Sequence, residues 1–214
     1  LPLLLHRVAM CVGKCSRILG PCLLVLGMLS MAANVLLLFP GGSSKYLAEA
    51  RITYHAKIMP GVWGGGITVS TLVVPTGVFF LECPCVEQGG GMSAWWLPFI
   101  CQCLLALLGA TACFVLSGVG LTNGPLCFYN SSEHGTLWGY PFLDADSQEP
   151  DDRTGNYLYN RGTWSTCLEP AGIVAWNVTF FSLLLLISAA EMVLASIQIL
   201  NGLLGCLCGF CEGK

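Results

Sequence analysis

The sequence has little charge for its length. Only 10% of its 214 residues are Asp, Glu, Lys or Arg, whereas a soluble domain carries about 25%. So few charged side chains cannot cover a globule in water, which excludes an ordinary soluble domain. The hydrophobic content of 55% and the mean hydropathy of +0.71 indicate a membrane protein instead.

Basic patches and catalytic motifs are also missing. The formal net charge is −3 and there is no run of Lys and Arg, which excludes a nucleic-acid-binding surface. There is no nucleophile elbow, phosphate-binding loop or HExxH helix, and the three histidines, His6, His55 and His134, are scattered. We therefore expect no enzyme activity, no cofactor and no metal site.

Long hydrophobic runs are what the sequence has instead. A membrane-spanning helix needs about 20 mostly apolar residues, and four runs qualify: 18–39, 59–81, 97–121 and 173–200. The predicted fold class is an all-α membrane protein, a bundle of four transmembrane helices. The remaining segments are the N-terminus 1–17, a small loop 40–58, a connector 82–96, a large loop 122–172 and the C-terminus 201–214.

The chain begins with Leu1, and its first residues have neither the basic start nor the cleavage site of a signal peptide. We interpret residues 1–9 as an artefact of the choice of fragment or gene model, and expect Met10 to be the natural start. A start at Met10 leaves Met-Cys-Val-Gly-Lys-Cys ahead of the first span.

The large loop indicates the orientation of the chain. Lys and Arg do not, because the two sides of the membrane carry nearly equal numbers of them. The loop contains the sequon Asn130-Ser131-Ser132 and two cysteines, Cys127 and Cys167. A sequon often arises by chance, but together with an isolated cysteine pair it indicates the oxidising side of a membrane. We predict an extracellular large loop, an extracellular small loop and cytosolic termini.

A second sequon, Asn177-Val178-Thr179, lies at the start of the fourth span. It is too close to the bilayer for the transferase to reach, and Trp176 beside it is typical of the interfacial aromatic belt. We expect Asn130 to be the glycosylated residue and Asn177 to remain bare.

Most other cysteines lie at the expected cytosolic ends of the spans. Cysteines next to a membrane are typical sites of reversible S-palmitoylation. The candidates are Cys11, Cys15, Cys83, Cys85, Cys206, Cys208 and Cys211. The alternative is that such cysteines are small apolar filler, which is the interpretation we prefer for Cys113, deep in the third span.

The fourth span contains an acidic residue, Glu191. An acidic side chain near mid-bilayer costs roughly 2.5–3.5 kcal/mol, so we expect Glu191 to face the interior of the bundle. Gln102 and Gln198 lie at a similar depth on the inner side and are its candidate partners. Asn34 lies near the outer face, and we do not expect it to meet Glu191.

Two interpretations of Glu191 remain open. In the first, it forms interhelical hydrogen bonds that hold the bundle or a partner helix. In the second, it belongs to a proton or ion path. We favour the first, because the predicted spans contain no Lys, Arg or His that would complete a relay.

Small residues in the second and third spans predict close contacts between helix backbones. They are Gly64, Gly65, Gly66, Gly109, Ala110, Ser117, Gly118 and Gly120. The alternative is that lipid-embedded helices simply tolerate small residues.

Several motifs occur in an order that is typical of one family. They are MCVGKCSRILG (10–20), ANVLLLFPGG (33–42), GVWGGG (61–66), NGPLC (123–127), YLYNRGTWSTCLEP (157–170), WNVTFFSLLL (176–185) and IQILNGLLG (197–205). On these motifs the chain resembles the transmembrane-4 L-six family of tetraspanin-like proteins, from Met10 almost to its end. The short, acidic connector departs from the longer, more basic connector of that family.

The resemblance implies four spans, cytosolic termini and a glycosylated large loop. By analogy with tetraspanins, it also implies that a disulfide between Cys127 and Cys167 closes the large loop into a small extracellular domain between spans three and four. On the chain-entropy model, closing a loop of about 40 residues stabilises it by roughly 4 kcal/mol.

The resemblance also implies a function. Family members gather integrins, receptors and tetraspanins into membrane domains, affect adhesion, migration and proliferation, and are not known as enzymes. The expected function is therefore that of a scaffold, in the plasma membrane or endosomal membranes. Its expected partners are such membrane proteins, the lipid bilayer and a second copy of the chain. The alternative is a channel or transporter subunit, or a regulator of one, that uses Glu191.

Overall fold

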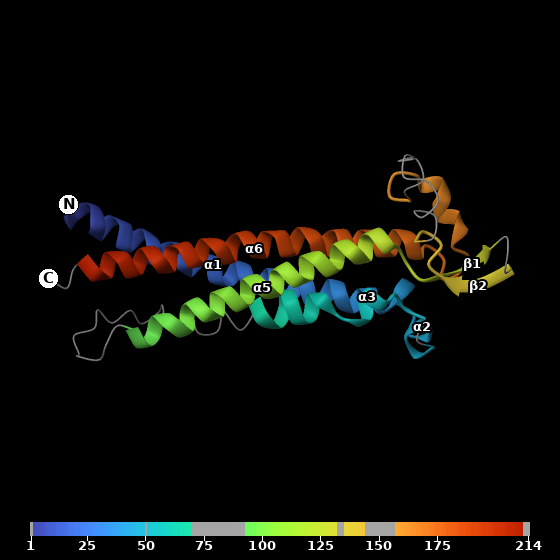
Figure 1. Cartoon of the computed structure of the whole chain (residues 1–214), viewed down its shortest axis with the longest axis horizontal. Coiled ribbons are helices and arrows are strands. Elements are labelled where there is room, and N and C mark those ends of the chain that lie inside the picture. The colour runs from blue at the N-terminus through green and yellow to red at the C-terminus, as the bar shows by residue number, and fades with distance from the viewer. Residues whose placement is uncertain (1, 50, 70–92, 132–134, 144–156, 212–214) are drawn as a thin grey trace.

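A computed structural model describes residues 2–49, 51–69, 93–131, 135–143 and 157–211 of the chain. Three long helices form its body (Figure 1): α1 Pro2–Leu37, α5 Ser93–Asn123 and α6 Ile173–Cys211. Each contains a stretch that is long and apolar enough to cross a membrane. These stretches are Ile18–Leu37, Cys101–Asn123 and Ile173–Leu203. They coincide with three of the four predicted spans.

The helices extend beyond the hydrophobic runs. α1 begins at Pro2, far ahead of the predicted span 18–39, and α6 continues to Cys211, past residue 200. The length of an apolar run is set by the thickness of the membrane that it crosses. The helix itself can continue past the membrane, because each added residue forms a further backbone hydrogen bond. The predicted spans therefore mark the membrane-crossing parts of longer helices.

The second predicted span, 59–81, is described only as far as Val69. It begins with η2, a π-helix over Gly61–Ile67 that follows Pro60. Residues 70–92, which hold the rest of this span and most of the connector 82–96, lie outside the described residues. A complete fourth span therefore remains a prediction.

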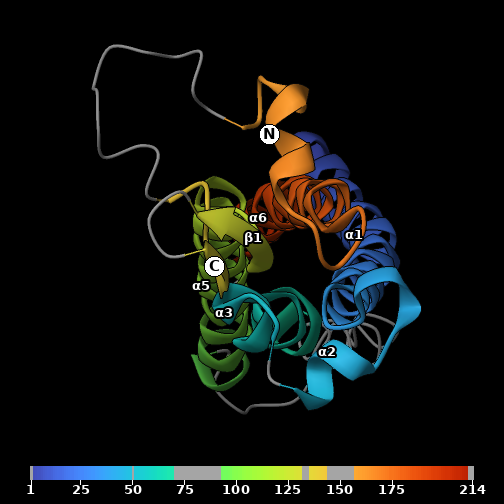
Figure 2. The same cartoon turned by 90° about the vertical axis from the view of Figure 1, so that its right-hand side faces the viewer.

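The described helices pack around a common axis (Figure 2). α6 contacts both α1 and α5, and η2 contacts the same two helices. η2 thus takes the place that a fourth helix has in a bundle. Along this axis lies the main apolar cluster, which includes Leu37, Cys113, Phe181 and Leu184, all buried. Other side chains on the long helices are exposed and apolar, such as Leu108 and Leu186, which suits a surface that faces lipid.

The loops gather at one end of the bundle, opposite the start of α1 and the end of α6 (Figure 1). After α1 come the short helices η1 Pro40–Gly42, α2 Lys45–Ala48 and α3 Tyr54–Lys57. After α5 come the strands β1 Cys127–Ser131 and β2 Gly135–Gly139, and then the 3-10 helix η4 Arg161–Thr166. The strands form an antiparallel hairpin in which Cys127 pairs with Gly139. We call the described residues of 40–58 and 122–172 the loop domain.

Candidate functional site

Glu191 lies in the centre of the bundle, where four elements meet. Its side chain on α6 is fully buried. One carboxyl oxygen is 3.0 Å from the position that a Cβ on Gly65 of η2 would take, and the hydroxyl of Ser30 on α1 lies against the same position. The thiol of Cys113 on α5 lies near Ser30, Gly65 and Glu191.

The carboxyl group of Glu191 has no hydrogen-bond partner among the described residues, at either oxygen. Ser30 donates instead to the carbonyl of Gly61, at 3.0 Å. Gln198 is buried and Gln102 half-buried, but neither is hydrogen-bonded to Glu191. The hydrogen-bonded cluster with Gln102 or Gln198 is therefore not formed. The groups around the carboxyl are the backbone of a glycine, a hydroxyl and a thiol.

Asn34 occupies a second polar position, closer to the loop end of α1. It is fully buried, and both polar atoms of its side chain lack a hydrogen-bond partner among the described residues. Its Cβ is 2.9 Å from the position of a Cβ on Gly61, whereas Glu191 approaches Gly65. The two polar side chains thus face glycines about one helical turn apart.

Backbones approach most closely where glycines face each other. The carbonyl of Gly64 on η2 is 2.7 Å from the position of a Cβ on Gly109 of α5, and the carbonyl of Gly109 lies against the Cβ position of Gly64. At Gly120 the ring of Phe181 comes within 2.6 Å of that position. A Cβ on Gly118 would make only an ordinary van der Waals contact, because its nearest neighbour is 3.9 Å from that position. The predicted close contact between backbones is thus present at Gly64 and Gly109, whereas Gly120 makes room for an aromatic side chain and Gly118 has no close neighbour.

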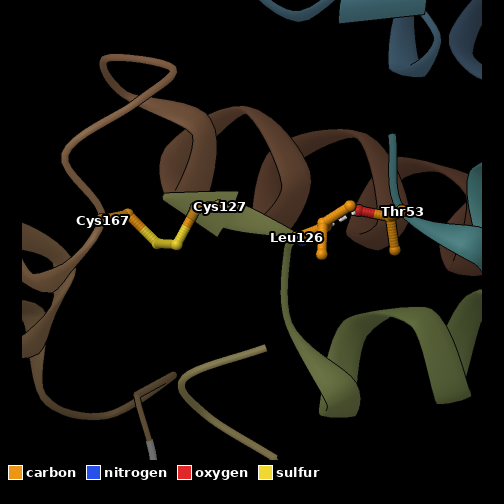
Figure 3. The surroundings of a disulfide bond; sticks show 4 residues. All are labelled: Thr53, Leu126, Cys127 and Cys167. Carbon is orange, nitrogen blue, oxygen red and sulfur yellow. Dashed lines mark hydrogen bonds between the residues drawn. A yellow bond between two sulfur atoms is a disulfide. The ribbon is translucent and has the colours of Figure 1, made fainter. Parts of the chain in front are cut away.

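A disulfide joins Cys127 to Cys167, as the resemblance implied (Figure 3). Their Cα atoms are 5.6 Å apart. Next to this bond, Phe128 donates a backbone hydrogen bond to the carbonyl of Glu169, and Leu168 donates one back to Phe128, both at 2.9 Å. The disulfide and the backbone pairing together hold the start of the large loop to its end.

The small loop is attached to the large loop by hydrogen bonds. The backbone N–H of Leu126 donates to the hydroxyl of Thr53 at 3.2 Å (Figure 3). The backbone N–H of Tyr54 donates to the phenol of Tyr140 at 3.1 Å. The two loops therefore form one unit.

An aromatic contact adds to this attachment. The guanidinium of Arg51 lies 4.6 Å from the ring centre of Trp138 and forms a salt bridge with Glu49 at 2.9 Å. Trp138 also packs against Tyr46 and Phe128, with ring centres 6.4 Å and 5.7 Å away. Because Arg51 and Tyr46 belong to the small loop, their contacts with Trp138 of β2 also join the two loops.

Tyr157 ties the large loop to α5, a role that sequence reasoning missed. Its phenol donates to the carbonyl of Leu121 at the end of α5, and its ring stacks on Phe142 with centres 4.5 Å apart. The indole of Trp164 donates to the carbonyl of Tyr157 at 2.8 Å. Burial raises the pKa of Tyr157 to about 12. Aromatic residues in YLYNRGTW were the only signal in the sequence for this contact.

The two sequons differ in exposure. Asn130 lies on β1 with an exposed side chain, whereas Asn177 on α6 is only 3% exposed. Both polar atoms of Asn177 also lack a hydrogen-bond partner among the described residues. An exposed side chain leaves room for a glycan on Asn130, and its glycosylation remains a prediction.

None of the seven acylation candidates has a described side chain. Only the backbone is described at Cys11, Cys15, Cys206, Cys208 and Cys211, and Cys83 and Cys85 lie outside the described residues altogether. Among the cysteines with described side chains, Cys22 and Cys101 are free and exposed, and Cys103 and Cys113 are free and buried. Within the described part of the chain, no group of three or more His, Cys, Asp or Glu side chains is placed to hold a metal ion.

Apolar helices that cross the membrane and a disulfide-closed loop domain at one end define a multi-pass membrane protein. The family model for L6 membrane proteins matches residues 10–212, and the chain belongs to this family. It is 40% identical over 214 residues to Transmembrane 4 L6 family member 19 of Mus musculus, covering 96% of this chain and 97% of that protein. It is 36% identical over 208 residues to Transmembrane 4 L6 family member 1 of Homo sapiens, covering 94% of this chain and 96% of that protein. No solved structure matches it significantly.

Proposed function

We propose that this protein is a scaffold without enzymatic activity, which gathers other membrane proteins beside it. The observation that carries this proposal is that the loop domain exposes large apolar and aromatic side chains. Its two loops are held together and to the bundle, yet the exposed fraction is 49% for Leu143, 83% for Tyr159 and 54% for Leu168. Exposed aromatic and aliphatic side chains on a rigid support are typical of protein recognition surfaces.

The bundle supplies the second part of the proposal. The exposed side chains of the long helices are largely apolar, so lateral contacts with partner helices would rest on close packing in lipid rather than on charge. The resemblance to tetraspanin-like proteins supports integrins, receptors or tetraspanins as partners. It also supports cytosolic termini, acylated cysteines, a glycan on Asn130 and a location in plasma or endosomal membranes. The expected consequences concern adhesion, migration and proliferation.

Surface variants test the role of the loop domain. The full-length protein is purified from cells in mild detergent, and co-purifying membrane proteins are quantified against an unrelated four-span protein. Tyr159→Ser combined with Leu168→Ser should remove partners that the loop domain recognises. Tyr54→Ser removes an exposed aromatic side chain from the small loop of the same domain, so it tells recognition by the large loop apart from recognition by both loops. A partner list that equals that of the unrelated protein would contradict the scaffold proposal.

A second candidate function follows from the carboxyl group of Glu191. Hydrogen-bonded glue between helices needs a partner, and neither oxygen of Glu191 has one among the described residues. This observation favours the alternative, in which Glu191 belongs to a proton or ion path. Flux through reconstituted vesicles distinguishes the two. A flux that is present in the wild type and absent in Glu191→Gln supports the path, and the absence of any flux in the wild type contradicts it.

A further inference from the structure

The strand β2 forms an edge of the small sheet in the loop domain. Its neighbour β1 is paired on both sides. On one side β1 pairs with β2, and on the other side Phe128 exchanges backbone hydrogen bonds with Leu168 and Glu169. On the outer side of β2, no backbone segment pairs with the strand within the part of the chain that the structure describes. β2 is therefore the strand that can pair with another chain.

The outer side of β2 presents the backbone groups of Thr136 and Trp138. Along an antiparallel strand, residues alternate between those whose N–H and C=O face the partner strand and those whose groups face away. Phe128 bonds to Leu168 and Glu169, so its backbone groups face away from β2. Trp138 lies opposite Phe128, so its groups face away from β1, and so do those of Thr136 two residues before it.

β2 lacks the features that usually protect a free edge. Its sequence, GTLWG, contains no charged residue and no proline, whereas exposed edges typically carry Lys or Pro, which prevent pairing with another chain. Tyr46 and Arg51 of the small loop pack on the ring of Trp138. Because side chains stand roughly perpendicular to a sheet, these contacts cover a face of the hairpin rather than its edge.

A second copy of β2 is complementary to this edge. When two copies pair antiparallel about a two-fold axis at Leu137, Thr136 of each copy lies opposite Trp138 of the other. Each of these opposed pairs exchanges both of its N–H and C=O hydrogen bonds, so every outward group of the strand is used. An axis at Thr136 or Trp138 would instead place the other residue opposite one outside the strand. The two Leu137 side chains meet at the axis, and no like charges face each other.

The direction of the hairpin decides where the second copy lies. β1 and β2 extend beyond the end of the bundle, along its length (Figure 1). Two antiparallel copies of β2 run in opposite directions, so their bundles point away from each other. Such bundles cannot share one membrane in the same orientation, but they can lie in two membranes that face each other.

We propose that β2 is a homophilic adhesion site, at which copies of this protein in two facing membranes pair edge to edge. The proposal rests on the predicted extracellular position of the loop domain and does not require the scaffold function. One pair of strands buries little surface, so adhesion depends on many copies whose contacts act together. Asn130 belongs to β1 and its side chain stands on a face of the sheet, so a glycan there leaves the edge of β2 free.

Purified full-length protein in two sets of phospholipid vesicles tests this proposal. The sets carry protein with different tags and no other protein, so scaffolding of partners does not contribute. Leu137→Cys should form disulfides between the two tags after the sets are mixed with a mild oxidant. The reason is that residues opposed in this way have Cα atoms about 4.5 Å apart, within the range of a disulfide. Leu143→Cys, at an exposed position elsewhere in the loop domain, is the matched control and should not.

Cross-links that form only when both tags share one vesicle would overturn the proposal, because the second copy would then lie in the same membrane. Equal cross-linking at the two positions would also overturn it, and so would none at Leu137. The same mixtures distinguish this failure from that of the scaffold function, which is measured in cells by the co-purifying partners.

Charge exchange at Leu137 provides a second measurement, the clustering of the mixed vesicles by light scattering. Leu137→Lys in both sets, or Leu137→Glu in both, should abolish the clustering seen with the wild type, because like charges then lie opposite each other. Leu137→Lys in one set and Leu137→Glu in the other should restore it, which also shows that both variants fold. Leu143→Lys should cluster as the wild type does. Wild-type vesicles that stay apart, like-charged sets that cluster, or opposite charges that fail to restore clustering would each contradict the proposal.

Discussion

Glu191 is accommodated inside the bundle by a residue that has no side chain. The hydroxyl of Ser30 lies against the position that a Cβ on Gly65 would take, and a carboxyl oxygen of Glu191 is 3.0 Å from it. Sequence reasoning placed Glu191 in the interior but expected glutamines beside it. The rise per residue gives the height of a side chain along a span, but the rotation of each helix decides which side chains face each other. Ser30 and Cys113 were therefore not predictable as neighbours of Glu191.

Gly65→Ala tests this close contact. The added Cβ would meet the hydroxyl of Ser30, and it would lie 3.0 Å from the carboxyl oxygen of Glu191. Overpacking of this kind costs typically about 1–3 kcal/mol, so we expect a lower Tm for the purified protein in detergent. Gly118→Ala is the matched control, because its Cβ has no neighbour nearer than 3.9 Å. Equal losses of Tm in both variants would contradict the contact at Gly65.

Glu191→Leu tests whether the carboxyl group contributes to stability. Replacing a buried polar group that has no hydrogen bond with an apolar one is neutral or stabilising. We therefore expect an unchanged or higher Tm in detergent, with Glu191→Gln as the variant that keeps the shape of the side chain. A Tm that falls in Glu191→Leu and is restored in Glu191→Gln would show that the group does form hydrogen bonds that hold the bundle.

At the scale of elements, the apolar spans were predictable and the hairpin inside the loop domain was not. Runs of apolar residues locate the membrane-crossing parts of α1, α5 and α6, because the bilayer requires about 20 apolar residues whatever the neighbours are. The hairpin of β1 and β2 has no comparable signal. Its strands are short, and their side chains pack on aromatic residues from distant parts of the chain, such as Tyr46. Contacts of this kind depend on the tertiary fold.

Tyr157 connects the large loop to the end of α5, and its ionisation should affect stability in alkaline solution. Burial raises its pKa from the ordinary value of 10.0 to about 12. The folded state thus favours the protonated phenol, so this contribution is complete below pH 10 and is lost as the pH rises toward 12. We expect Tyr157→Phe to reduce the fall in Tm across this range. An identical fall in wild type and variant would contradict a buried phenol at this position.

At the scale of the whole molecule, the two ends of the bundle differ in chemistry. The loop end carries the disulfide, the exposed Asn130 and the aromatic contacts between the loops. The other end carries the start of α1 and the end of α6 (Figure 1). We predict that the loop end is extracellular. The resemblance to a family supplied the disulfide, whereas hydropathy and charge alone left the orientation open.

Glycosylation of the protein made in cells tests this orientation. Asn130→Gln should lower its apparent mass by one glycan, because the side chain of Asn130 is exposed on β1. Asn177→Gln should leave the mass unchanged, since Asn177 is buried. Treatment with an N-glycosidase provides the reference for the bare protein. A wild-type protein that has no glycan, or one that has it on Asn177, would contradict the predicted orientation or the fold around α6.

The central claim is that an intact loop domain selects the partners of a membrane scaffold. Cys127→Ser combined with Cys167→Ser opens the large loop and leaves the long helices in place. The most direct measurement is the set of membrane proteins that co-purify with this variant and with the wild type, expressed at equal levels in the same cells. We predict a short, reproducible set of partners for the wild type that is lost in the variant. A set that is the same for both would contradict the claim.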